Sequence, residues 1–219
     1  MSNLKLLNVQ NAKTVKGEKQ GYMTFILYLA PGKLSGYQVC PQSTDECRSA
    51  CLYYAGRGNM ASVQKSRLGK TRMYFEATDT FLKVLYSDIG KACLSAKRKG
   101  LTPVFRLDGT SDLGLAKLVS RKFPNLQFYD YTKCPGRHGS DNWHVTFSYS
   151  GPNLKESLTR LRGGDNVAVV FKGDLPETWL GFPVVDGDET DLRFLDPAGT
   201  VIGLHAKGPA KNLDGSFVS

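Results

Sequence analysis

The sequence predicts an α/β protein, a partial (β/α) barrel of about six mainly parallel strands folded as one domain. Two observations predict it. Strand-like apolar segments alternate with helix-like segments beyond residue 100, and parallel strands need such crossover connections. The 219 residues also suit a single domain, 1–219, with one core. A doubly wound open sheet is the alternative architecture.

The N-terminal part is organised around one strand and a cysteine-rich loop, which together cover residues 22–58. Residues 1–20 are polar and contain several lysines, so we expect a short lead-in segment there. Residues 22–29 are aromatic and branched, as in a buried strand, and Pro31 and Gly32 end it.

The later elements follow from periodicity and stop signals. Phe81, Leu85 and Ile89 recur every fourth residue, which indicates the buried face of a helix that Gly100 ends. Residues 166–171 are almost wholly apolar, as in a strand inside a parallel sheet. The predicted elements are helices over 78–99, 113–123 and 154–162, and strands over 103–107, 126–132, 143–149, 166–171, 184–188 and 201–206.

Three cysteines, Cys40, Cys47 and Cys51, lie close together in the loop after the first strand. On irregular backbone such thiols can converge on one metal ion or cluster, whereas along a helix or a strand they would mostly point apart. The alternatives are a disulfide or inert buried thiols. Residues 1–6 do not resemble a signal peptide, so we expect a cytoplasmic protein with reduced thiols, which favours metal binding.

The number of nearby thiols favours a [4Fe–4S] cluster over zinc. A structural zinc site takes four protein ligands, whereas a cluster held by three thiolates leaves one iron open to a small molecule. Cys134 follows the predicted strand 126–132 and is the candidate fourth metal ligand, the alternative being a plain loop thiol. Cys93 continues the apolar stripe of helix 78–99, which indicates a packed, inert thiol.

Polar side chains gather after the predicted strands, where ligands bind in parallel α/β proteins. The candidate cofactor-binding residues are Arg106, Asp108, Thr110, Asp112, Lys133, His205 and Lys207. Helix capping alone would also explain Asp112. Turn chemistry explains the aspartates of residues 186–196, which lack the spacing of an EF-hand loop. We expect His144 to be structural and His138 to face solvent.

Charge is distributed unevenly along the chain. The whole sequence carries a net charge of +9, but residues 165–219 hold 9 acidic against 4 basic residues. Residues 1–164 therefore hold 25 Lys and Arg against 11 Asp and Glu, a net +14. Such a basic body can attract nucleic acid, although the basic stretch 57–72 is also explained as a solvated helix face. No apolar run is long enough to span a membrane.

The cysteine loop is similar to the cluster loop of radical S-adenosylmethionine enzymes, whose fold is a full or partial (β/α) barrel. The similarity lies in three cysteines after a first strand, with Tyr53 and Tyr54 just beyond. The usual spacing there is Cys-x3-Cys-x2-Cys, whereas this chain has Cys-x6-Cys-x3-Cys. The resemblance implies a [4Fe–4S] cluster whose fourth iron binds the amino and carboxylate groups of S-adenosylmethionine.

Further segments resemble the phage-encoded gene product 88-like family, which has no assigned function. They are RLDGTSD at 106–112, FYDYTK at 128–133, NVAVVF at 166–171, VDGD at 185–188 and GLHAKG at 203–208. With the cysteine loop they extend from about residue 24 to the C-terminus. This resemblance implies a phage origin, hence the host-cell cytoplasm, and a metallo-cluster, but no particular reaction.

Two functions compete on this basis. The first is a cluster-bearing enzyme that uses S-adenosylmethionine on an unknown substrate, with the loop cysteines as cluster ligands and the strand-end residues binding cofactor or substrate. The second is a basic nucleic-acid-binding phage protein with a structural zinc or cluster site and no catalysis. A cluster protein that has lost catalysis and acts through protein contacts is a third possibility.

Overall fold

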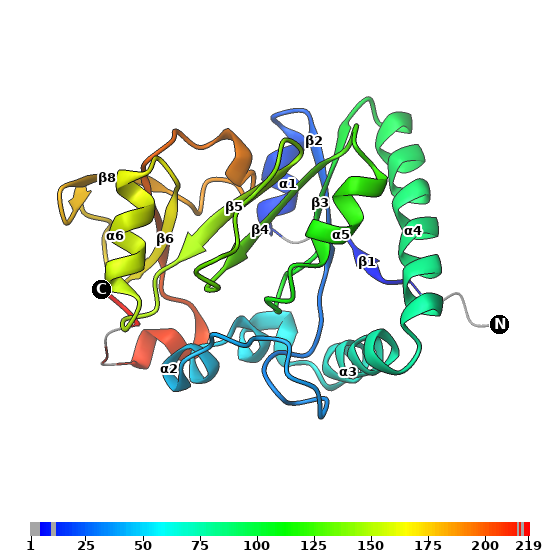
Figure 1. Ribbon diagram of the computed structural model, residues 1–219, viewed down its shortest axis with the longest axis horizontal. Coiled ribbons are helices and arrows are strands. Elements are labelled where there is room, and N and C mark those ends of the chain that lie inside the picture. The colour runs from blue at the N-terminus through cyan, green and yellow to red at the C-terminus, as the bar shows by residue number, and fades with distance from the viewer. Residues whose placement is uncertain (1–4, 10–11, 214, 216) are drawn as a thin grey trace.

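The computed structural model describes residues 5–9, 12–213, 215 and 217–219. Within these residues one nine-stranded sheet runs through the molecule in the order β1-β2-β3-β4-β5-β6-β9-β8-β7 (Figure 1). The strands are β1 Leu7–Asn8, β2 Tyr22–Leu27, β3 Thr102–Arg106, β4 Gln127–Thr132, β5 Trp143–Ser148, β6 Val167–Phe171, β7 Thr178–Trp179, β8 Phe182–Asp186 and β9 Val201–His205.

Helices and short 3-10 turns connect these strands. The α-helices are α1 Ala12–Glu18, α2 Asp45–Ser49, α3 Ala61–Glu76, α4 Thr78–Arg98, α5 Leu115–Lys122 and α6 Leu154–Arg162. The 3-10 turns are η1 Leu52–Tyr54, η2 Gly56–Asn59, η3 Arg193–Leu195 and η4 Gly208–Asn212. None of the described helices is both long enough and apolar enough to cross a membrane.

The centre of the sheet is parallel and its strands follow chain order. From β2 to β6 each strand pairs in parallel with the next one along the chain, and β9 and β8 continue the parallel part. Among the described strands, the two outer ones run antiparallel, β1 against β2 and β7 against β8. Between β2 and β6 the order has no reversal of the kind that defines a doubly wound sheet.

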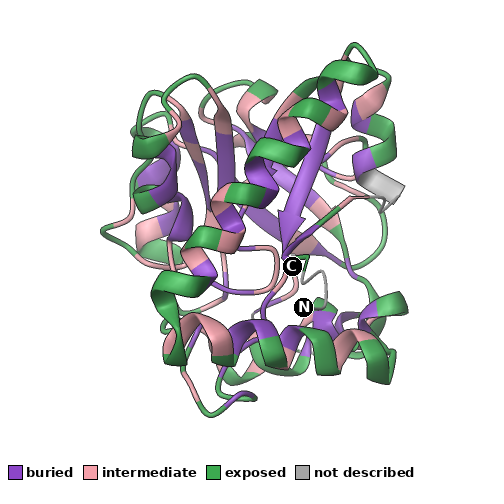
Figure 2. Cartoon of the chain, turned by 90° about the vertical axis from the view of Figure 1, so that its right-hand side faces the viewer, coloured by how far each residue is buried: buried purple, intermediate pink, exposed green. Residues whose placement is uncertain are grey.

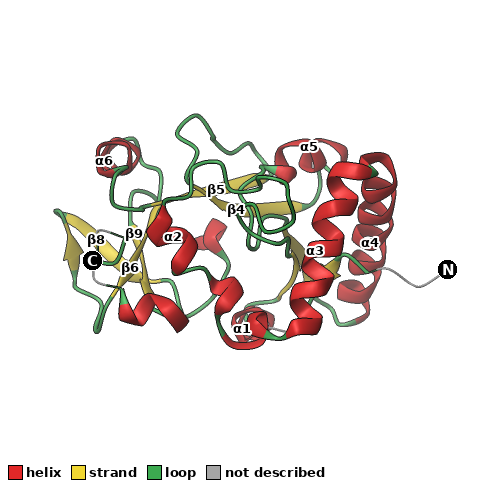
Figure 3. Cartoon of the chain, turned by 90° about the horizontal axis from the view of Figure 1, so that it is seen from below, coloured by secondary structure: helices red, strands yellow, loops and turns green. Residues whose placement is uncertain are grey.

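One face of the sheet is covered by α4, α5 and α6, and it holds most of the apolar core. Phe25, Phe105 and Phe128 stack across three neighbouring strands, with ring centroids 5.6 and 5.4 Å apart. Phe81 and Leu85 of α4 pack into the same core and are fully buried. Figure 3 shows α5 and α6 on this side of the strands and α1 on the other side.

The opposite face combines a small apolar cluster with polar side chains. Val104 and Tyr129 pack there against Leu192, which precedes η3. Because side chains alternate along a strand, Arg106 points to the same face as Val104. This face continues toward the carboxyl ends of the strands, where it becomes more polar.

Beyond those carboxyl ends lies the segment from Pro31 to Met60, which contains α2, η1 and η2 and which we call the cysteine segment. In Figure 1 α2 and α3 lie at the bottom of the molecule, below the sheet. Figure 2 shows α3 crossing that end while the strands above it are buried. The chain therefore closes one end of the sheet with the residues that follow its first parallel strand.

The sequence predicted the type and place of most of these elements. Helix 154–162 coincides with α6, helix 78–99 matches α4 to within a residue, and helix 113–123 contains α5. The strand predictions overlap β2 to β6, β8 and β9, with ends that differ by up to two residues. The structure confirms the α/β class and a mostly parallel sheet, with seven parallel strands instead of about six.

In two stretches the structure shows more than the sequence predicted. The segment 1–20 is not a mere lead-in, because it contributes β1 and α1, and Leu6 and Leu7 are buried against the core; residues 1–4 and 10–11 lie outside the described part. The basic stretch 57–72 is not simply a solvated face, because Arg67 and Lys70 of α3 are buried. Hydrophobic periodicity could not predict the buried strand β1, which has only two residues, nor the buried cations of α3, which follow no apolar pattern.

Candidate functional site

A cavity of about 1020 Å³ lies where the carboxyl ends of the strands meet the cysteine segment. Tyr131, Ser148 and Val170 line it from the strands, and Leu52 and Tyr54 line it from the cysteine segment. Among the sequence-predicted site residues, those that line it are Cys40, Cys47, Cys51, Arg106, Asp108, Thr110, Asp112, Lys133, His205 and Lys207. The structure thus brings together ten residues that come from distant parts of the sequence.

The three cysteines reach the cavity from three short pieces of local structure. Cys40 follows the turn after β2, and its Sγ accepts a hydrogen bond from the backbone N–H of Gly32 at 3.5 Å. Cys47 lies in α2, where its backbone N–H donates to the Thr44 side chain that caps the helix. Cys51 directly precedes η1. All three are free, half-buried thiols.

The thiols are close enough to influence one another's ionisation. Burial, opposed by the Gly32 hydrogen bond, raises the pKa of Cys40 to about 12, and charge on Cys51 and Cys47 would raise it further. Burial also raises the pKa of Cys51. At neutral pH the Cys40 and Cys51 thiols are therefore protonated in the metal-free protein, and a metal that binds them must displace the protons.

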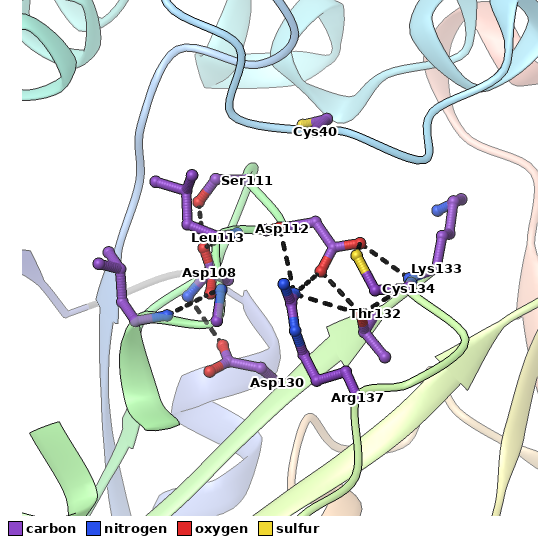
Figure 4. A network of polar contacts seen from close by, with 12 residues as sticks. Cys40, Asp108, Ser111, Asp112, Leu113, Asp130, Thr132, Lys133, Cys134 and Arg137 are labelled. Carbon is purple, nitrogen blue, oxygen red and sulfur yellow. Dashed lines mark hydrogen bonds and ion pairs between the residues drawn. The ribbon is translucent and has the colours of Figure 1, made fainter. Parts of the chain in front are cut away.

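Cys134 differs from the other three cysteines in its surroundings. Its Sγ is 3.7 Å from Asp112 Oδ2, to which the thiol donates, and it is not among the described residues that line the cavity. Burial and the neighbouring Asp112 carboxylate both raise its pKa. The sequence suggested Cys134 as a fourth ligand, and in the structure its thiol is hydrogen-bonded to the Asp112 carboxylate (Figure 4).

Asp108 anchors the loop beneath the cysteine segment. Its carboxylate accepts hydrogen bonds from Ser111 Oγ at 2.6 Å and from the backbone N–H groups of Leu113, Gly114 and Leu115 at 2.8–3.1 Å (Figure 4). Although it borders the cavity, its oxygens are used by its own loop. Its role in the site is therefore to position neighbouring residues.

Asp112 links this loop to the loop after β4. Its carboxylate accepts hydrogen bonds from Thr132 Oγ1 and from the backbone N–H of Lys133, both at 2.8 Å, and forms an ion pair with Arg137. The Lys133 side chain points away from this network in Figure 4. Among the described residues, none forms an ion pair with Lys133 Nζ, so its ammonium group is available to an anionic ligand in the cavity.

Arg106 is held by a buried ion pair that the sequence did not predict. Its Nη1 is 3.2 and 3.1 Å from the two carboxylate oxygens of Asp191, and Tyr129 donates to the same carboxylate at 3.0 Å. The guanidinium also stacks over Tyr131 at 4.5 Å. Burial alone would lower the pKa of Arg106, but Asp191 raises it above its ordinary value. Asp191 lies in the aspartate-rich stretch whose residues turn chemistry was expected to explain.

His205 and Lys207 share a second carboxylate, Asp188. His205 Nδ1 is 3.1 Å from Asp188 Oδ2, and Lys207 Nζ is 2.6 Å from Asp188 Oδ1. The backbone N–H of His205 also donates to Asp188, which fixes the end of β9 against the loop after β8. Asp186, Asp188 and His205 each offer a ligand atom within 4.8 Å of one another, but Lys207 already neutralises Asp188. Sequence reasoning explained Asp188 by turn chemistry, although its place at the end of the predicted strand 184–188 was a usable signal.

The two other histidines lie outside the cavity lining as described. His144 is half-buried with Nε2 3.3 Å from Thr146 Oγ1, as expected of a histidine held within the fold. His138 is exposed beside Arg160 and Asp165, as its glycine-rich loop predicted. Cys93 is half-buried and packs against the core from α4, which agrees with an inert thiol.

Comparison with known proteins finds one family. The family model described as gene product 88 matches residues 4–218. The match includes the cysteine segment and every strand end that borders the cavity. No curated protein and no solved structure matches the chain.

Proposed function

This chain belongs to the gene product 88 family, and on that premise we propose that it is a phage-encoded iron–sulfur protein of the host-cell cytoplasm. Cys40, Cys47 and Cys51 hold a [4Fe–4S] cluster, and the rest of the cavity binds S-adenosylmethionine and a substrate. The observation that carries this proposal is that three free thiols from one segment line the same cavity as the polar strand ends.

The donor set fits a cluster better than a structural zinc ion. Thiolates are the ligands that iron–sulfur clusters prefer, and structural zinc takes four protein ligands. Among the described residues the fourth nearby thiol, Cys134, is engaged by Asp112. Three thiolates with no ready fourth leave one iron free for a small molecule. When bound, the cluster would supply single electrons to a sulfonium cofactor.

The chain's own residues supply the binding chemistry. The Lys133 ammonium can pair with a cofactor or substrate carboxylate, because no described residue neutralises it. Arg106 is fixed by Asp191 and by stacking on Tyr131, so it offers a rigid cation at the cavity wall. Asp108 and Asp112 keep their two loops in place beneath the cysteine segment. Leu52, Ala168 and Val170 add apolar surface to the lining of the same cavity.

The sheet order supports a radical-SAM-like partial barrel for this site. From β2 to β6 each strand lies beside its successor, with α4, α5 and α6 on one face. In a barrel built this way the helices cover the outside and the ligand sits at the carboxyl ends of the strands. The cavity occupies that end.

The test is anaerobic purification and reconstitution with iron and sulfide. We expect a brown protein that contains iron and sulfide in equal amounts. Cys47→Ser should lose most of the iron, whereas the matched control Cys93→Ser, on α4 away from the cavity, should keep it. A colourless zinc-containing protein would remove the cluster. An electron paramagnetic resonance spectrum that S-adenosylmethionine leaves unchanged would remove the cofactor while keeping the cluster.

A second candidate function is nucleic-acid binding through basic residues outside the cavity. Arg98 and Lys99 at the end of α4, and Arg121 and Lys122 at the end of α5, are exposed on neighbouring helices. Binding through them would weaken steeply with salt, because it releases counterions. If no binding to DNA or RNA is detected at about 50 mM salt, where such contacts are strong, this candidate is excluded.

A further inference from the structure

Arg67 of α3 is a buried cation for which the described residues provide no carboxylate. Arg67 is only 9% exposed, and its Nε and Nη1 atoms are buried without a hydrogen-bond partner. Arginine stays protonated under nearly all conditions, so this position carries a full positive charge. A buried charge without a partner is unusual, because its loss of hydration is not compensated.

The guanidinium is instead surrounded by aromatic rings at the back of the cysteine site. It lies 4.7 Å from the ring centroid of Tyr28 and 5.5 Å from that of Tyr53. Tyr28 lines the cavity, and Tyr53 follows Cys51 by two residues. Rings attract a cation only modestly, and they accept no strong hydrogen bond from it.

The Cys51 thiol, two residues before Tyr53, is also close enough to Arg67 for charges on the two groups to interact. Charge on Cys51 and on Arg67 would interact favourably, since each shifts the ionisation of the other toward its charged form. Three thiolates around a [4Fe–4S] centre would carry a net negative charge in the same place.

We propose that Arg67 is the counter-charge of the metal–thiolate centre, where it strengthens metal binding and raises the reduction potential of the cluster. The inference rests on the proposed cluster site and assigns to it a residue that is neither a ligand nor part of the cavity lining. Arg67 acts through the thiolates, so it is a positioning residue. A nearby positive charge stabilises the more negative reduced cluster, which fixes the direction of the effect on the potential.

The experiment compares Arg67→Gln, which removes the charge, with Arg67→Lys, which keeps it, and with Arg72→Gln, an exposed position on the same helix. Zn²⁺ affinity is measured by competition with a chromophoric chelator, and the midpoint potential is measured on reconstituted protein. We expect Arg67→Gln to weaken Zn²⁺ binding at least tenfold and to shift the potential to more negative values. Arg67→Lys should recover most of both, and Arg72→Gln should match the wild type.

The results distinguish a failure of the role proposed for Arg67 from a failure of the proposed cluster site. If the wild type binds neither Zn²⁺ nor a cluster, both fail. If the wild type binds them and Arg67→Gln has unchanged affinity and potential, only the role of Arg67 fails. Arg67→Met in the presence of chelator tests folding: a variant that does not fold would show that the guanidinium stabilises the metal-free protein, and would overturn the proposal.

Discussion

Buried cations are the residues in which this protein departs most from what its sequence suggests. Arg67 and Lys70 looked like surface charge and Arg106 like a ligand-binding residue, yet all three side chains are largely withdrawn from solvent. Each has a different set of partners. Arg106 pairs with Asp191, whereas Lys70 Nζ donates to Leu6 O at 2.7 Å and to Asn8 Oδ1 at 3.1 Å. The basic residues of the N-terminal part therefore overstate the charge that a polyanion would meet.

Lys70 makes stability depend on pH in the alkaline range. Burial lowers its pKa from 10.5 to about 8. Between these values the unfolded chain keeps a proton that the native protein has lost, so native stability rises as pH increases through that window. Below about pH 8 the folded and the unfolded chain both hold the proton, so Lys70 does not make the free energy of unfolding depend on pH there.

We expect the stability difference between wild type and Lys70→Met to change by about 3 kcal/mol, in favour of wild type, from about pH 7 to about pH 11. Urea denaturation at a series of pH values measures it. The exposed Lys65→Met control should give a difference that does not change with pH. If the stability difference between wild type and Lys70→Met does not change with pH, then Lys70 keeps its proton in the native protein.

At the scale of elements, the cysteine segment depends on one close approach of its backbone. A Cβ on Gly58 would lie 2.7 Å from Leu52 O and 2.8 Å from Tyr53 O, closer than such contacts allow. These carbonyls belong to η1, which directly follows Cys51. Glycine at this position therefore lets η1 and η2 pack together behind the site.

Gly58→Ala should lower the free energy of unfolding by about 1–3 kcal/mol, because the backbone of η1 must move to accept the methyl group. Gly69→Ala in α3 is the matched control, since its Cβ would enter open space and alanine favours a helix by up to about 1 kcal/mol. Chemical denaturation of both variants gives the comparison. If Gly58→Ala and wild type are equally stable, the backbone of η1 can move to accept the methyl group without loss of folding free energy.

The elements also show how far the sequence could predict the structure. α4 and α6 were predicted almost to the residue because their periodicity and end signals agree. The gathering of Cys40, Lys133 and His205 followed from strand order alone, since parallel strands share one carboxyl edge. Pairs such as Arg106 with Asp191 could not be predicted, because the two residues are 85 positions apart and only the folded loop before η3 joins them.

At the scale of the whole molecule, two apolar cores share a strand. β5 contributes Trp143 and Val145 to the core beneath α4 and α5, and Phe147 to the core beneath α6. Its neighbour β4 is paired with it along five residue pairs. The two cores are therefore joined through β5, although they contain different helices.

The two tryptophans of the chain report on these cores separately, since Trp143 lies in the first and Trp179 packs against the second. We expect Trp143→Phe and Trp179→Phe each to show the same denaturation midpoint by tryptophan fluorescence and by far-ultraviolet circular dichroism, as two-state unfolding requires. Midpoints that differ between the two probes would show that one half unfolds before the other.

The short antiparallel strands at the two margins of the sheet have a consequence for self-association. β1 and β7 are each two residues long, so the outermost backbone offers few donors and acceptors to a neighbouring molecule. Long exposed margins act as templates on which further copies add strands and aggregate. The short outer strands of this chain limit that hazard at both margins of its broad, mostly parallel sheet.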